Sequence, residues 1–188
     1  MSIIFELFKT SGKKVCPPNY IRKYNCPLIV RTTSEDLLTA NVFGILKNLD
    51  PKVWLRKFLG EAIKGKDFSK HSFEGLSFEF CKRYRPPVNR KYREGISEVD
   101  VTISYKDVII FIEAKYLAPV NLRTTHDSRR DQIIRYLDLA AYHYLNHPDS
   151  VKEFYFVLII DTDKPPWILT RYQYNQNLTN GLTNPGLF

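Results

Sequence analysis

The chain has 188 residues, of which 44% are hydrophobic, 26% charged and 14% aromatic. This composition is typical of a folded protein with one domain, or two at most, and it excludes disorder over most of the chain; no apolar run approaches the roughly 18 residues that a bilayer span requires. Lys and Arg number 28 against 20 Asp and Glu, and the resulting charge of +8 favours an anionic partner such as nucleic acid.

Residues 1–32 are mixed in character, and we interpret them as an irregular N-terminal arm. Glu6 interrupts their apolar start, so this segment is a poor secretory signal. Cys16, Cys26 and Cys81 cannot all pair within one chain, and no two of them have the spacing of a zinc knuckle. We therefore expect reduced thiols, a cytoplasmic protein and no membrane partner.

Two consecutive helices are predicted after this arm. Thr33 and Ser34 are good caps for the first, and Asp50 and Pro51 both end it and begin the second, which runs to about Gly65. The predicted buried faces are Leu38, Val42, Ile45, Leu46 and Leu49 in the first helix, and Val53, Trp54, Phe58 and Ala62 in the second.

The periodicity then changes to two, which predicts strands. Phe78 and Phe80 mark the first strand; the next three are expected at 97–104, 108–112 and 154–160, with a long helix at about 127–146 before the last. The third strand is apolar on both faces, which indicates a central position. We thus predict an α/β fold with a mixed central β-sheet flanked by helices on both faces, over residues 33–162, followed by an irregular tail at 163–188.

Charge appears where the third strand ends. Alternation places Glu113 and Lys115 on the same face as Ile109 and Phe111. In the preceding strand, alternation puts Val99, Val101 and Ile103 on one face, and Glu98, Asp100 and Thr102 on the other. A turn centred on Lys106 would bring Asp100 opposite about residue 112, beside Glu113. Two adjacent carboxylates repel unless a cation lies between them, and Mg²⁺ fits such oxygen ligands. Lys115 would then serve the attacking water or the phosphoryl charge.

These residues resemble the signature of the PD-(D/E)XK nuclease superfamily, which has an acid on one strand of a hairpin and Glu-x-Lys on the next. Here the acid is Asp100, preceded by Val99 rather than Pro, and the second motif is Glu113-Ala114-Lys115. Gln132 and Tyr136 resemble the Gln-x3-Tyr motif of nuclease domains attached to bacterial recombination helicases, and their spacing puts both side chains on one helix face.

The resemblance implies a restriction-endonuclease-like core and Mg²⁺-dependent hydrolysis of phosphodiesters, with Mn²⁺ as a substitute ion. It implies that Asp100, Glu113 and the Ala114 carbonyl hold the metal and that Gln132 orients the lysine or the substrate. Glu35 is placed where the superfamily often has an accessory acid, as a further metal ligand. Cutting both strands of a duplex would require a homodimer or two successive events.

A basic segment precedes the strand that bears Asp100. It holds six cations and no acid: Lys82, Arg83, Arg85, Arg90, Lys91 and Arg93. Together with Arg129 and Arg130, which open the predicted long helix, these side chains are expected to contact a phosphate backbone, of DNA rather than RNA.

Each of these features also has a purely structural interpretation. The three site charges could form a cross-strand salt-bridge cluster, the basic segment could simply be solvated, and Glu35 could be a first-turn carboxylate facing the helix dipole. Gln132 could be an exposed polar residue, and Tyr136 core packing. At the level of function, the alternatives are a catalytically silent nucleic-acid-binding or assembly module and a hydrolase of another phosphate ester.

Overall fold

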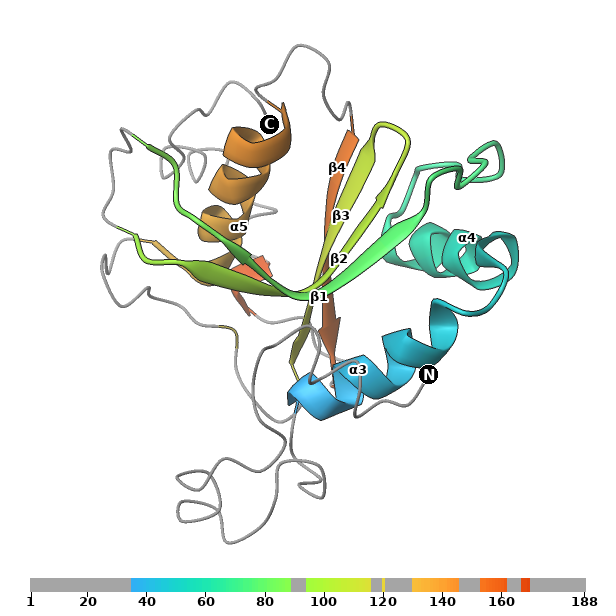
Figure 1. Ribbon diagram of the computed structural model, residues 1–188, viewed down its shortest axis with the longest axis horizontal. Helices are drawn as coiled ribbons and strands as arrows, with labels where there is room; N and C mark the ends of the chain where they lie inside the picture. The colour runs from blue at the N-terminus through green and yellow to red at the C-terminus, as the bar shows by residue number, and fades with distance from the viewer. Residues whose placement is uncertain are drawn as a thin grey trace, which may run out of the picture.

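The computed structural model describes residues 35–88, 94–115, 120, 130–145, 153–161 and 167–169, and shows a mixed four-stranded sheet between helices (Figure 1). The elements are α3 (Glu35–Leu46), α4 (Pro51–Ala62), β1 (Ser77–Tyr84), β2 (Ser97–Tyr105), β3 (Val108–Lys115), α5 (Gln132–Ala140), the π-helical turn η2 (Ala141–Leu145) and β4 (Glu153–Ile160). The predicted order of helices and strands and the α/β class are confirmed. In the described ranges, no helix has the length and apolar character of a membrane span.

The sheet has the strand order β1-β2-β3-β4. The first three strands are antiparallel, and β4 runs parallel to β3. The β2–β3 turn lies at Lys106 and Asp107, so Val101 pairs with Ile112. One residue further in this register, Asp100 lies opposite Glu113 rather than opposite residue 112.

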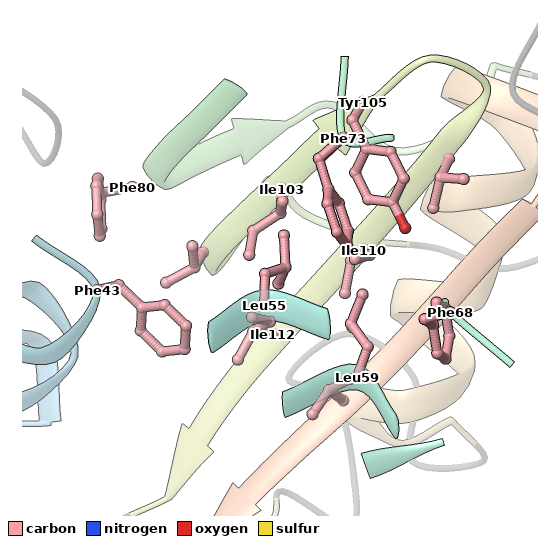
Figure 2. Packing of buried hydrophobic residues seen from close by; sticks show 13 residues of the cluster. Phe43, Leu55, Leu59, Phe68, Phe73, Phe80, Ile103, Tyr105, Ile110 and Ile112 are labelled. Carbon is pink, nitrogen blue, oxygen red and sulfur yellow. The ribbon is translucent and has the colours of Figure 1, made fainter. Parts of the chain in front are cut away.

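Strand β3 is a central strand of the sheet, as predicted. Every residue from Val108 to Ala114 is buried. Ile110 and Ile112 pack against the α3 and α4 side, as Figure 2 shows, whereas Ile109 and Phe111 pack against α5. This arrangement fixes the direction of the two charged residues at the end of β3, because alternation then turns them toward α5.

The predicted buried face of the first helix is largely wrong. Thr39, Ala40 and Phe43 are buried, whereas Leu38, Val42, Ile45 and Leu49 are 44–59% exposed; of the predicted face, Leu46 alone packs against the core. The helix is apolar on most of its surface, so periodicity could not choose between two stripes. Tertiary packing decides, since the Phe43 ring contacts aromatic rings of α4.

The start of α4 follows the prediction, but its buried face does not. Asp50 accepts a hydrogen bond from the Lys52 backbone at 2.9 Å, and Pro51 is the first helical residue. The helix ends at Ala62, earlier than expected. Leu55 and Leu59 are its fully buried residues, as Figure 2 shows, with Trp54 and Phe58 partly buried beside them, whereas Val53 and Ala62 are exposed.

The predicted alternation along β2 breaks at Asp100. Val101 and Ile103 pack on the α4 side, but Val99 packs on the α5 side. Asp100 lies opposite Cys81, between the pairs Phe80–Val101 and Lys82–Val99, and the Cys81 backbone is left-handed with φ of 49°. A kink shared by β1 and β2 therefore reverses which residues of β2 face α5. The alternation of apolar and polar residues along β2 does not change at this point, so the sequence pattern did not predict the reversal.

Helix α5 begins at Gln132, five residues later than predicted. Asp131 is its cap and accepts from the backbone N–H groups of Ile133 and Ile134 at 2.9 and 3.0 Å. Residues 127–129 and 146, which the longer prediction included, lie outside the described residues. Ile168, from the predicted tail, is 1% exposed and packs with Ile133. The tail therefore contributes to the core.

Candidate functional site

The Glu113 carboxylate is the centre of a hydrogen-bond network at the α5 end of β3. Its Oε1 accepts from Gln132 Nε2 at 2.6 Å and from Lys115 Nζ, and its Oε2 accepts from Tyr136 Oη at 2.7 Å. Gln132 and Tyr136 lie one helical turn apart on α5, and Gln132 Nε2 also donates to Tyr136 Oη at 2.9 Å. The motif spacing thus brings two side chains of α5 onto one carboxylate of β3.

Asp100 joins this network through the backbone. Its Oδ2 accepts from the Ala114 N–H at 2.9 Å, which holds the carboxylate of β2 against the residue that follows Glu113. The bond lies beyond the last ladder pair of β2 and β3, Val101–Ile112. Asp100 is half-buried, so the two predicted acids come from neighbouring strands and reach the same end of the hairpin.

Lys115 is paired with Glu113 away from water. The side chains are 9% and 4% exposed, respectively, and Lys115 Nζ also donates to the Ala114 carbonyl at 3.2 Å. Isolated charges at this depth would cost several kcal/mol, and pairing offsets that cost. Asp100, Glu113 and Lys115 together carry one excess negative charge, which favours an added cation over an added anion.

Tyr136 acts as a hydrogen-bond donor within the network. Burial and the neighbouring Glu113 carboxylate raise the pKa of Tyr136 far above its usual value, so the phenol stays protonated. Its single hydrogen has two acceptors, Glu113 Oε2 at 2.7 Å and the Glu98 carbonyl at 3.0 Å. The carboxylate is nearer and charged, so it is the stronger acceptor.

Arg130 is not available to a phosphate, and this corrects its prediction as a nucleic-acid contact. Its side chain is 1% exposed, and it donates to Glu94 at 2.7 Å and to Asp138 at 2.5 Å. Arg135 adds a bond to Ser97 Oγ at 2.5 Å. This cluster ties the start of β2 to α5. No local pattern predicts this cluster, because its members are spread over 45 positions, from Glu94 to Asp138.

The described part of the basic segment lies on β1 and just beyond it. Lys82 bonds to Glu79 at 2.5 Å and to Tyr144 at 3.1 Å; burial opposes its charge, but these bonds outweigh burial and raise the pKa of Lys82. Arg83 is exposed and pairs with Glu98 at 2.9 Å, and Arg85 is exposed. Arg83 and Arg85 are therefore accessible to an anionic ligand, whereas Lys82 is half-buried.

Several predicted site residues cannot be placed in this network. Glu35 is the first residue of α3, but its side chain lies outside the part of the chain that the structure describes. Arg90, Lys91, Arg93 and Arg129 also lie outside the described residues.

The comparisons with protein-family models, curated proteins and solved structures found no match to the chain.

Proposed function

We propose that the chain is a metal-dependent nuclease with a restriction-endonuclease-like core that hydrolyses phosphodiester bonds in DNA. The observation that carries the proposal is the convergence of Asp100, Glu113, Lys115 and Gln132 at one end of the β2–β3 hairpin. A salt-bridge cluster alone would not need the amide of Gln132, nor a second acid bonded to the Ala114 backbone.

The residues fit a hard divalent cation by their chemistry. Among the described residues no group of three or more His, Cys, Asp or Glu could hold a metal. Mg²⁺ commonly uses one or two carboxylates and keeps several waters, so Asp100, Glu113 and the Ala114 carbonyl are a sufficient set. Gln132 Oε1 is a buried oxygen that accepts no hydrogen bond within the described chain. A metal-bound water would supply the donor that this oxygen lacks.

Each side chain has a distinct part in the proposed reaction. When bound, Mg²⁺ would polarise the phosphoryl oxygens and lower the pKa of a bound water. Asp100 and Glu113 would hold the cation, and the Lys115 ammonium would orient the attacking water or offset charge on the phosphate. Gln132 keeps Lys115 and Glu113 in place, because its amide bonds to the same oxygen as Lys115.

The cleavage test uses the full chain with duplex, single-stranded and branched DNA, and with RNA, in Mg²⁺ or Mn²⁺. We expect cleavage that EDTA abolishes and that Lys115→Ala slows by roughly 10²–10³-fold. Lys106→Ala is the matched control, since Lys106 is exposed in the β2–β3 turn at the other end of these strands. A folded protein that cuts none of these substrates, or Lys115→Ala with unchanged activity, contradicts the proposal.

One observation favours a second candidate, the catalytically silent binding module. Both Glu113 oxygens already accept hydrogen bonds from side chains of the protein, so the carboxylate is satisfied without a metal. This candidate predicts DNA binding that weakens with salt, together with no heat from Mg²⁺ or Mn²⁺ in calorimetry. Metal binding at micromolar to millimolar concentration that Glu113→Gln abolishes favours the nuclease instead.

A further inference from the structure

Trp167 is the largest exposed apolar side chain in the described residues. It is 58% exposed, whereas the next residue, Ile168, is 1% exposed. The chain has two tryptophans, and the other, Trp54, is partly buried against Phe43, Phe58 and Phe78. Trp167 is therefore held in place through its neighbour while much of its own indole surface faces solvent.

The buried neighbour anchors this segment on the α5 side of the sheet, which is also the side of the candidate site. Ile168 packs in one cluster with Val120 and Ile133, and Leu158 and Leu169 border that cluster. Ile133 follows Gln132 directly, and Leu158 is the β4 partner of Glu113 in the parallel ladder. Since neighbouring strands lie about 4.8 Å apart, Leu158 is one strand away from Glu113, and the cluster of Ile168 packs against Leu158.

We propose that Trp167 is a base-stacking residue that binds an unpaired nucleobase of the strand whose backbone enters the site at Glu113. This inference rests on the proposed function and names its substrate class, which is nucleic acid with single-stranded character. An exposed indole offers a π surface to any base, whereas a base within a duplex is already stacked on its neighbours. The charge of +8 attracts the phosphate backbone, and Trp167 adds an apolar contact that phosphates cannot provide.

The direct test uses the fluorescence of Trp167 itself. In a Trp54→Phe background Trp167 is the only tryptophan, and EDTA prevents cleavage during the titration. Oligo-dT of about twelve nucleotides should quench the emission in a saturable manner, whereas an abasic oligonucleotide of the same length and a blunt duplex should bind with little quenching. Equal quenching by the abasic strand, or no quenching when labelled oligo-dT is bound, overturns the proposal.

A second measurement keeps Trp54, so its result does not depend on whether the Trp54→Phe variant folds correctly. Fluorescence anisotropy of labelled oligo-dT should show that Trp167→Ala binds roughly 5- to 150-fold more weakly, with Trp167→Tyr close to the original protein. Val53→Ala is the matched control, because Val53 is an exposed apolar residue of α4 on the opposite face of the sheet. Binding by Trp167→Ala equal to that of Val53→Ala overturns the proposal.

The two proposals fail separately. Cleavage without base-dependent quenching removes the role of Trp167 and leaves the nuclease proposal standing. Base-dependent quenching without cleavage under any condition removes catalysis and leaves Trp167 in a single-strand-binding protein. An oligo-rU arm in the same titration compares RNA with DNA, and stacking predicts quenching by both strands.

Discussion

Gln132 and Tyr136 bind opposite oxygens of one carboxylate. Gln132 Nε2 lies 2.6 Å from Glu113 Oε1, Tyr136 Oη lies 2.7 Å from Glu113 Oε2, and the two side chains bond to each other at 2.9 Å. This triangle fixes the plane of the carboxylate, because both of its oxygens are held by one rigid helix. The Glu113 side chain is therefore oriented before any ligand binds.

Tyr136→Phe tests this orientation. The change keeps the ring contacts with Phe111 and Phe156 but removes the donor to Glu113 Oε2. We expect a loss of about 1.5–3 kcal/mol in the free energy of unfolding, measured by urea denaturation, because hydrogen bonds to buried charged groups are worth that much. Tyr155→Phe is the control, since its bond to Glu153 is on a half-exposed edge strand. Equal losses for both variants contradict the prediction.

The buried pair of Glu113 and Lys115 should show strong energetic coupling. Glu113→Gln leaves a buried ammonium without its charge partner, so we expect a loss of about 3–5 kcal/mol in the free energy of unfolding. Lys115→Met should cost less, because Gln132 and Tyr136 still donate to Glu113.

A double-mutant cycle measures this coupling. The double variant should lose less than the two single variants added together, by about 1–3 kcal/mol. The exposed pair Glu61 and Lys64, at 3.3 Å, is the control, and its cycle should be additive within about 0.5 kcal/mol. Additive behaviour at Glu113 and Lys115 would show that solvent screens the pair.

Sequence patterns within one segment correctly predicted the central strand, the start of α4 and the shared helix face of Gln132 and Tyr136. The run Val108–Ile112 is apolar on both faces, which is sufficient to identify a central strand. Asp50 and Pro51 predict the start of α4, because an Asp side chain caps the first backbone N–H groups of a helix and Pro is favoured at the first helical position. The four-residue spacing of Gln132 and Tyr136 is also local, and it placed both side chains on the face that meets Glu113.

The features that sequence did not reveal depend on contacts between distant segments. Two apolar stripes run along α3, and the aromatic rings of α4 select the one with Phe43. The reversal at Asp100 needs the left-handed backbone of Cys81 on the neighbouring strand. Arg130 looked like a surface cation because its acidic partners, Glu94 and Asp138, come from other elements.

The buried position of Arg130 leads to a prediction about stability. Arg130→Met leaves the carboxylates of Glu94 and Asp138 buried with one cation fewer, so the free energy of unfolding should fall by about 3–5 kcal/mol. The control is Arg83→Met, because Arg83 is 66% exposed and its pair with Glu98 should be worth no more than about 1 kcal/mol. Urea denaturation measures both. Similar small losses would mean that water reaches Arg130.

Alkaline pH should destabilise the protein through its buried tyrosines. Burial raises the pKa values of Tyr84, Tyr105 and Tyr136 above the value near 10 of an unfolded chain. Above pH 10 the unfolded state releases these protons while the folded state retains them. Stability is therefore fully present below about pH 10 and falls as the pH rises, by up to about 1.4 kcal/mol per pH unit for each tyrosine.

Urea denaturation at pH 8, 9, 10 and 11 checks this dependence. In Tyr136→Phe the free energy of unfolding should fall less steeply with pH above pH 10, because one of the three buried tyrosines no longer contributes. The variant is nevertheless less stable than the original protein at pH 8. Tyr155→Phe should change the slope less, because the raised pKa of Tyr155 comes from a half-buried ring beside Glu153. An unchanged slope in Tyr136→Phe would show that Tyr136 ionises in the folded protein as it does in water, and that the donor to Glu113 is lost at high pH.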